Sequence, residues 1–318
     1  LETCTTPQPL RIRFTMMKNM VLLKLIIAMS TLVFSTMAVA EITVSETKVK
    51  GLSPVESTLD TTNSLAAVDC IKDDAITATE LTKTRDNGPF SIKSKHVSRQ
   101  SANGFGGGTI LGGIAVVPGY VSYESSIKWW GPRLASWGFV VITINTSSIY
   151  DNPDSRAEQL SAALDHLVAD ETVGHMIDPN RLGAIGWSMG GGGALRLATE
   201  RSTVQAIIAQ TPYHDTSYGA MDTPALFIAC ENDRIAPNKK YTNIFYQKAD
   251  GPKMKVEINN GSHFCASHRF NEKLLSKPAI AWMQRYINGD TRFDKFLCGN
   301  DSYKNDPRIS AYDYEDCL

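Results

Sequence analysis

The chain has 318 residues, of which 42% are hydrophobic and 20% are charged, and its formal net charge is -1. This composition is typical of a water-soluble protein with enough apolar residues for one sizeable α/β domain. The near balance of acidic and basic residues argues against nucleic acid as a partner.

The N-terminal segment has the features of an export signal. Lys18 precedes an apolar run, Val21–Phe34, which is followed by the small-x-small sequence Ala38-Val39-Ala40. Signal peptidase accepts such a sequence, so we expect cleavage after Ala40. The run is shorter than the roughly 20 apolar residues that cross a bilayer, which favours a signal peptide over a membrane span.

The segment after this signal has no pattern of a folded element. Residues 41–69 are rich in Ser and Thr and lack aromatic side chains. Such a composition favours a flexible leader or pro-segment. We therefore expect a leader and signal peptide over 1–40, a Ser/Thr-rich leader or pro-segment over 41–87, and one folded domain over 88–318.

From residue 90 onward, short apolar runs alternate with helical segments. A half-buried edge strand is expected at Phe90–Lys93. Runs of the kind buried in a parallel sheet are Ile110–Val117, Phe139–Ile144, Leu182–Ile185, Ala206–Ala209, Ala225–Ala229 and Met254–Ile258. Helices are expected at Ser125–Ser136, from the capping box Ser155-Arg156-Ala157-Glu158 onward, and through Ala194, Leu195 and Ala198. The alternation predicts an α/β protein with a mostly parallel central sheet and helices on both faces.

One glycine-rich stretch lies between a predicted strand and a predicted helix. Gly186-Trp187-Ser188-Met189-Gly190 has the G-x-S-x-G pattern. In this context the pattern is typical of the nucleophile elbow of the α/β-hydrolase fold, where a tight turn exposes the serine above the sheet. Side chains at positions 186 and 190 would collide with neighbouring backbone in such a turn. Ser188 is therefore the candidate nucleophile.

Two phosphate-binding alternatives fail on spacing. A Walker loop needs Lys followed by Ser or Thr after its last glycine, whereas Ala194 and Leu195 stand there. In a dinucleotide-binding fingerprint that starts at Gly186, Ser188 would occupy the second glycine position and crowd the pyrophosphate.

A serine hydroxyl needs a base, and the base needs a carboxylate to hold its tautomer. In this fold the chain order is Ser, acid, His. Of the histidines after Ser188, which are His214, His263 and His268, His263 follows an apolar strand directly. Asp233 follows the preceding strand, and Glu231 is the next best acid. We expect a Ser188–His263–Asp233 triad, with backbone N–H groups of Met189 and Tyr120 as oxyanion donors.

The connection from Gln210 to Pro224 is too short for the helical cap that covers many lipase sites. We therefore expect an open site without a lid domain. An open apolar cleft suits short and medium acyl chains and insoluble ester surfaces.

The motifs resemble those of the bacterial cutinase-like polyester hydrolases and lipases. The stretches that carry the resemblance are Val117–Tyr120, Ser126–Ser136, Gly186–Gly193, Ala229–Asp233 and Gly261–Ala266. The resemblance runs from about residue 88 to the C-terminus. It implies the same triad and oxyanion donors, and a shallow substrate cleft lined by Tyr120, Trp187, Tyr213, Ile235 and Phe264. Two departures stand out: Tyr213 replaces the usual Trp, and the region from Gly108 to Gly113 is several residues short of the usual strand and hairpin.

The family pattern also implies two disulfides, Cys230–Cys265 and Cys298–Cys317, which suit an oxidising compartment. The first would link the acid loop to the histidine loop. Cys70 is left over, as a free thiol or in an intermolecular bridge. A zinc site is not expected there, because no cluster of ligand residues surrounds Cys70 in the sequence.

These features together predict a secreted, monomeric serine carboxylester hydrolase without cofactor or metal, and without a membrane segment after signal cleavage. The expected substrates are short- to medium-chain acylglycerols, with polyesters as a further class, cleaved through an acyl-enzyme on Ser188. The alternatives are an amidase or acyltransferase with the same triad, and a non-catalytic binding protein of the same fold.

Overall fold

The protein is described from a computed structural model, in which residues 111–215, 218, 220–267 and 271–315 are described together with the backbone of two strands, 76–81 and 95–100. All of these residues belong to one unit of the chain, Ile42–Leu318. The sequence-based predictions that lie outside the described residues concern the signal peptide, the strand Phe90–Lys93, Cys70, His268 and Cys317.

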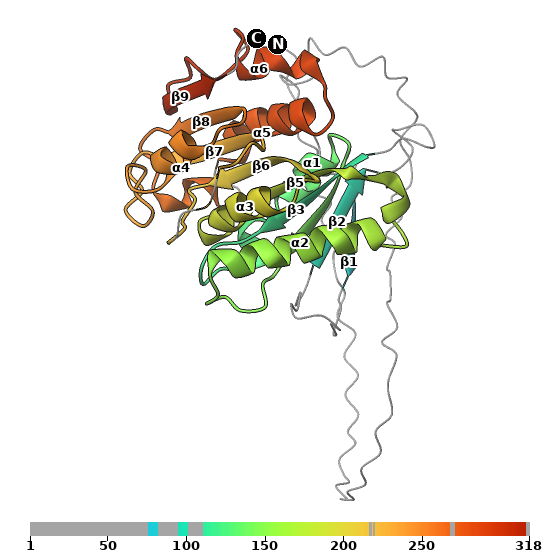
Figure 1. The fold of residues 1–318 in the computed structure, drawn as a ribbon. Helices are drawn as coiled ribbons and strands as arrows, with labels where there is room; N and C mark the ends of the chain where they lie inside the picture. Colours follow the sequence, from blue (N-terminus) through green and yellow to red (C-terminus); the bar gives the residue numbers. More distant parts are fainter. Residues whose placement is uncertain are drawn as a thin grey trace, which may run out of the picture. The chain divides into compact units, whose positions relative to one another are not determined.

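In the described part of the chain, nine strands form one sheet in the order β1-β2-β4-β3-β5-β6-β7-β8-β9 (Figure 1). The six strands from β4 to β8 in this order run parallel, whereas β1, β2 and β9 pair antiparallel at the two edges. The strand bounds are β1 Ile76–Leu81, β2 Lys95–Gln100, β3 Leu111–Val117, β4 Phe139–Ile144, β5 Ile177–Trp187, β6 Val204–Gln210, β7 Ala225–Cys230, β8 Lys253–Ile258 and β9 Ile309–Glu315. The mostly parallel sheet is confirmed.

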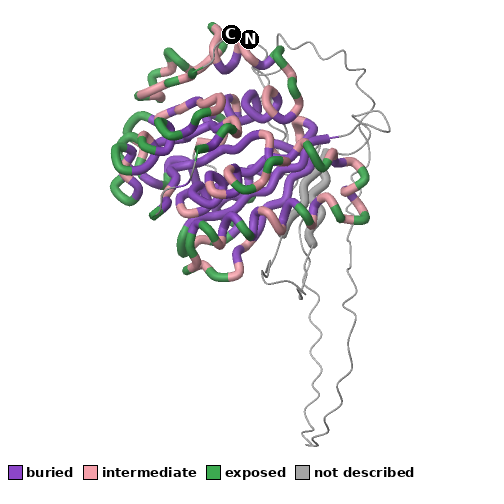
Figure 2. Tube along the Cα trace, viewed as in Figure 1, coloured by how far each residue is buried: buried purple, intermediate pink, exposed green. Residues whose placement is uncertain are grey.

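The central strands are apolar on both faces because both faces are covered. Every residue of β3 and β4 is buried, and Figure 2 shows the central strands as the most continuously buried part of the chain. Successive side chains of β3 enter opposite cores: Ile114 and Val116 one, Ala115 and Val117 the other. Strands of this kind read as continuous hydrophobic runs rather than as alternating ones.

Helices cover the two faces of the sheet. The core on one face includes residues of α1 and α5, and the core on the other includes residues of α2, α3 and α4. Figure 1 shows α2 and α3 side by side on one face. The helix bounds are α1 Trp130–Ala135, α2 Pro153–Ala169, α3 Met189–Glu200, α4 Thr242–Lys248, α5 Glu272–Tyr286 and α6 Asp294–Leu297, with short 3-10 turns η4 Glu124–Ser126, η5 Gly174–Met176, η6 His263–Ala266 and η7 Thr291–Phe293.

Two helix starts differ from the prediction. Helix α2 begins at Pro153 rather than at the Ser155 capping box, because Asn152 is the N-cap and its side chain accepts a hydrogen bond from Ser155 N at 2.9 Å. Proline is tolerated at the first helical position, where its missing N–H has no intrahelical partner. Helix α1 is shorter than Ser125–Ser136, since η4 and a turn occupy the first part of that segment.

The sheet extends further at both edges than the hydrophobic runs indicated. Strand β1 lies N-terminal to residue 88, where the boundary of the folded domain was expected, and it pairs with β2. At the other edge β9 pairs with β8, and most of its residues are exposed or half-buried. Five strands, β3 to β7, contribute to the cores on both faces, whereas β8 contributes to one. The carboxyl ends of the six parallel strands lie on one edge of the sheet, where ligands of open α/β sheets bind.

Candidate active site

Ser188 lies in a strained turn between β5 and α3. Its backbone has φ +57° and ψ -117°, outside the conformations that L-residues usually adopt. The turn is possible because its glycines carry no Cβ: one at Gly186 would lie 1.9 Å from the oxygen of Gly190, and one at Gly190 would lie 2.5 Å from the oxygen of Pro118. This is the geometry that the G-x-S-x-G pattern predicts.

Three polar side chains meet at the carboxyl edge of the sheet. His263 Nε2 lies 2.8 Å from Ser188 Oγ, and His263 Nδ1 lies 2.7 Å from Asp233 Oδ2. Asp233 follows β7, and His263 opens η6 just beyond β8, so neighbouring parallel strands deliver both groups. All three residues are buried, at 4% to 6% exposure. The arrangement can therefore pass a proton from the serine hydroxyl to the imidazole without water between them.

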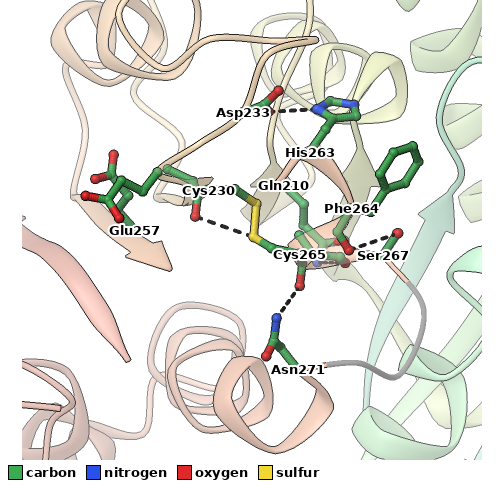
Figure 3. Close-up of a disulfide and its surroundings, with 12 residues drawn as sticks. Gln210, Cys230, Asp233, Glu257, His263, Phe264, Cys265, Ser267 and Asn271 are labelled. Carbon is green, nitrogen blue, oxygen red and sulfur yellow. Dashed lines mark hydrogen bonds and ion pairs between the residues drawn. A yellow bond between two sulfur atoms is a disulfide. The ribbon is translucent and has the colours of Figure 1, made fainter. Parts of the chain in front are cut away.

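The carboxylate of Asp233 is fixed by the backbone of its own loop. Oδ1 accepts hydrogen bonds from the N–H groups of Ile235 at 2.9 Å and Ala236 at 2.8 Å. Oδ2 is left to accept from His263 Nδ1–H (Figure 3). With the proton on Nδ1, the Nε2 lone pair points at Ser188 Oγ, which is the tautomer that a general base requires.

The other acidic and basic candidates do not join this cluster. Glu231 is exposed, and its carboxylate accepts from Asn260 N at 2.7 Å. The two ring nitrogens of His214 face Asp154 at 3.6 Å and Asp215 at 3.7 Å. His268 lies outside the described residues.

The two expected oxyanion donors border Ser188 from different elements. Met189 is the first residue of α3, so its N–H has no intrahelical acceptor. Tyr120 belongs to the loop after β3, in which Gly119 packs so closely that a Cβ there would lie 3.0 Å from Ser188 Cβ. The next residue, Val121, anchors this loop by donating its N–H to Ile149 O at 2.8 Å.

The residues expected to line the cleft differ in exposure. Tyr120, Ile235 and Phe264 are 52%, 57% and 49% exposed, so their side chains are available to a substrate. Tyr213 is half-buried, with its ring 5.0 Å from that of Tyr241, and burial raises the pKa of its hydroxyl. The fifth residue, Trp187, is only 4% exposed.

Trp187 contacts the histidine rather than solvent. Its ring centroid lies 5.5 Å from that of His263, and its Nε1 donates to the carbonyl oxygen of His263 at 3.2 Å. Phe264, which follows His263 in η6, also contacts Trp187, with ring centroids 5.7 Å apart. Trp187, the residue before the nucleophile, thus packs against His263 and hydrogen-bonds its main chain.

Comparison with known proteins decides the family. The PET hydrolase-like family model matches residues 73–317. The chain belongs to this family. Lipase 1 of Moraxella sp. strain TA144 is 67% identical over 96% of this chain and 99% of that protein. Cutinase 1 of Thermobifida cellulosilytica is 44% identical over 67% of this chain and 85% of its own length. Bis(hydroxyethyl) terephthalate hydrolase of Streptomyces coelicolor is 42% identical over 66% of this chain and 72% of its own length.

In this PET hydrolase-like chain, the disulfide expected between Cys230 and Cys265 is confirmed, with Cα atoms 6.1 Å apart. It joins the end of β7, which leads to Asp233, to the η6 segment that carries His263 (Figure 3). Cys298 is also disulfide-bonded, and its expected partner Cys317 lies outside the described residues.

One buried charge near the PET hydrolase-like site escaped the sequence analysis. The guanidinium of Arg156 is fully buried, pairs with Asp151 at 2.5 Å, and donates from Nη1 to Pro118 O at 3.3 Å. Burial lowers the pKa of Arg156, and the Asp151 carboxylate opposes that effect. The sequence pattern singled out Arg156 only as part of the expected capping box.

Among the described residues, no group of three or more His, Cys, Asp or Glu side chains is arranged to hold a metal ion. No helix in the same part of the chain has the length and apolar character to cross a membrane.

Proposed function

We propose that the protein is a secreted serine hydrolase of carboxylic esters that forms an acyl-enzyme on Ser188. As a PET hydrolase-like protein it is a carboxylester hydrolase. The observation that carries the serine mechanism is the continuous chain of hydrogen bonds Ser188–His263–Asp233, at 2.8 and 2.7 Å, next to a strained strand-to-helix turn.

In the acylation step, Ser188 Oγ attacks the ester carbonyl carbon while His263 Nε2 takes the hydroxyl proton. Asp233 stabilises the imidazolium that forms. The carbonyl oxygen becomes an oxyanion, which the N–H groups of Tyr120 and Met189 stabilise. His263 then donates its proton to the leaving alkoxide oxygen, so that the C–O bond breaks, the alcohol departs and the acyl group stays on Ser188.

Deacylation repeats these roles with water. His263 takes a proton from a water molecule whose oxygen attacks the acyl carbon, and the same two N–H groups stabilise the second oxyanion. The imidazolium returns the proton to Ser188 Oγ as the acid leaves. No cofactor or metal ion takes part in either half of the cycle.

We propose short- to medium-chain acylglycerols as substrates, with polyesters as a further class. The side chains of Tyr120, Ile235 and Phe264 are exposed to solvent, which supports the shallow, open cleft that the family resemblance implies. The related proteins carry the names lipase, cutinase and bis(hydroxyethyl) terephthalate hydrolase, and these names span both kinds of ester.

Export is part of the proposal. The N-terminal signal sequence and the disulfides both suit a protein that leaves the cytoplasm. We propose that it acts there as a monomer without a membrane anchor.

The deciding experiment compares wild type with Ser188→Ala on p-nitrophenyl butyrate. Loss of turnover in a folded variant supports the serine mechanism, and near-normal turnover contradicts it. The matching anilide and an added alcohol separate the alternatives. Faster cleavage of the anilide would identify an amidase, and faster acyl transfer to the alcohol would identify an acyltransferase. A folded wild type that turns over none of these substrates would identify a binding protein.

A further inference from the structure

The segment that carries His263 is only four residues long, so its position depends on contacts with the rest of the protein. In η6 the imidazole must stay within hydrogen-bond reach of Ser188 throughout the reaction. The disulfide at Cys265 ties this segment to the acid loop. The disulfide does not link η6 to the turn that carries Ser188.

Gln210 supplies such a link through its side chain. It is the last residue of β6 and is fully buried. Its Nε2 donates to Ala266 O, the final carbonyl of η6, at 3.0 Å, and its Oε1 accepts from Trp130 Nε1 at 3.2 Å. Figure 3 places Gln210 beside the η6 segment. The amide orientation is determined by chemistry, because an indole N–H can only donate and a carbonyl oxygen can only accept.

The backbone of Gln210 contacts the nucleophile. Its carbonyl oxygen accepts the N–H of Ser188 at 2.8 Å, and Trp187 pairs with Gln210 across the ladder between β5 and β6. One buried residue therefore hydrogen-bonds the serine turn with its main chain and the histidine segment with its side chain. The indole of Trp130 on α1 holds the amide in the orientation that aims Nε2 at Ala266.

We propose that Gln210 is a positioning residue that holds His263 at reacting distance from Ser188. The inference rests on the proposed function, in which His263 is the base for Ser188. Without the amide donor, the buried Ala266 carbonyl loses its hydrogen-bond partner. The η6 segment then shifts toward a position where another donor can reach this carbonyl. A displacement of the base by even a fraction of an ångström slows proton transfer without affecting the surface that binds the ester.

The test replaces Gln210 by Met, which has a similar length but cannot donate, with Gln205→Met as the matched control. Gln205 lies on the same strand, away from the site, where its amide donates to Ser202 O at 3.1 Å. For soluble p-nitrophenyl butyrate, kcat of Gln210→Met should fall about 10- to 100-fold, as expected for a misplaced catalytic group, with little change in KM. The control should keep the kcat of wild type.

Gln210→Glu gives a second readout that a merely structural role would not produce. A protonated carboxyl can donate to Ala266 O as the amide does, whereas a carboxylate cannot. The ratio of the variant's kcat to that of wild type should therefore be highest at low pH and fall as pH rises, within the range where circular dichroism shows both proteins folded. A ratio that rises with pH would contradict the role, and a constant ratio leaves the decision to Gln210→Met.

The outcomes separate this inference from the proposed function. An unchanged kcat in folded Gln210→Met overturns the positioning role, and a low kcat in Ser188→Ala would leave the proposed function standing in that case. Near-normal turnover of Ser188→Ala overturns both. If Gln210→Met does not fold, Trp130→Phe decides: it leaves Gln210 in place and removes the donor to its Oε1, and it also shortens a fully buried ring, so its kcat is compared at a temperature where the variant is folded. A lower kcat with wild-type KM then supports the role, and an unchanged kcat overturns it.

Discussion

Gly190 packs directly against Pro118, so closely that a Cβ atom at position 190 would lie 2.5 Å from the Pro118 carbonyl oxygen. This contact joins the first turn of the nucleophile helix α3 to the loop that carries Tyr120. The same carbonyl accepts a hydrogen bond from the buried Arg156. The two proposed oxyanion donors, Met189 and Tyr120, are thus held in register by a contact that only glycine permits.

Gly190→Ala should therefore lower activity by moving the Pro118–Tyr120 loop away from Ser188. Displacing one oxyanion donor costs about 100- to 1,000-fold in kcat. We expect a decrease of that order for p-nitrophenyl butyrate in steady-state assays. Gly191→Ala is the control: its Cβ would lie 3.0 Å from Pro212 Cα and 3.1 Å from the oxygens of Gln210 and Gly186, which are milder contacts outside the oxyanion loop. Equal activity of the two variants would contradict the argument.

Substitutions in the proposed triad test the assignment of roles. Ser188→Ala and His263→Ala should each lower kcat by several orders of magnitude, since nucleophile and base act as one unit. Asp233→Asn should cost somewhat less, because the imidazole remains in place. Circular dichroism and thermal unfolding would establish that each variant is folded.

Glu231→Gln provides the matched control for Asp233→Asn. Glu231 lies on the same loop but is exposed, and its carboxylate accepts a hydrogen bond from the backbone N–H of Asn260. It should keep nearly the kcat of wild type. A larger loss at Glu231 than at Asp233 would reverse the assignment of the acid.

Activity should rise with pH to a plateau, because only a neutral imidazole accepts the serine proton. Tyr213 does not contribute to this profile, since burial raises the pKa of its hydroxyl and keeps it protonated throughout. The measurement is kcat/KM against pH for a neutral ester, and a flat profile would count against a histidine base.

The sequence predicts the buried centre of the fold well, and the reason is visible in its strands. Strands β3 and β4 are buried on both faces, so they read as uninterrupted apolar runs. Strand β9 was missed although Tyr312-Asp313-Tyr314-Glu315 alternates aromatic and charged residues, because a short exposed edge strand gives a weak signal. The start of α2 was misplaced because two polar residues, Asn152 and Ser155, both suit an N-cap.

The spacing of Ser188, Asp233 and His263 in the chain was enough to select residues that the fold brings within hydrogen-bond distance. Supporting contacts were not predictable in the same way. Arg156 and Gln210 are polar residues that are usually exposed, and nothing local in the sequence indicates that tertiary packing buries them. Trp187 was assigned to the cleft by resemblance, whereas its indole is buried and donates a hydrogen bond to the main chain of His263.

Removal of the Cys230–Cys265 disulfide should affect both stability and catalysis. The bond closes a loop with a sequence separation of 35 residues. A loop of this size stabilises the folded state by about 3 to 4 kcal/mol in the chain-entropy model. The double variant Cys230→Ala, Cys265→Ala should therefore unfold at a lower temperature, as measured by calorimetry.

The same variant should lose kcat at temperatures well below its unfolding, because the bond joins the acid loop to the histidine segment. Wild type assayed after reduction by dithiothreitol and after reoxidation provides the control. Unchanged kcat in the folded double variant would limit the disulfide to a role in stability.

The connection between β6 and β7 predicts how the enzyme responds to substrate aggregation. Among the described residues of this connection there is no helix, and the side chains of Tyr120, Ile235 and Phe264 are about half exposed beside Ser188. With no cover to displace, hydrolysis of tributyrin should rise smoothly with concentration and show no jump when droplets begin to form. Titrimetric rates measured across the solubility limit would test this.

The shallow cleft also sets a limit on acyl length. Each methylene that the protein removes from water contributes about 0.8 kcal/mol, but carbons beyond the reach of Tyr120 and Ile235 stay in water and add nothing to the transition state. Rates should therefore fall from short or medium acyl esters to long ones in a p-nitrophenyl ester series. A sharp increase at the solubility limit, together with a preference for long-chain triglycerides, would contradict the open cleft and indicate a lidded lipase.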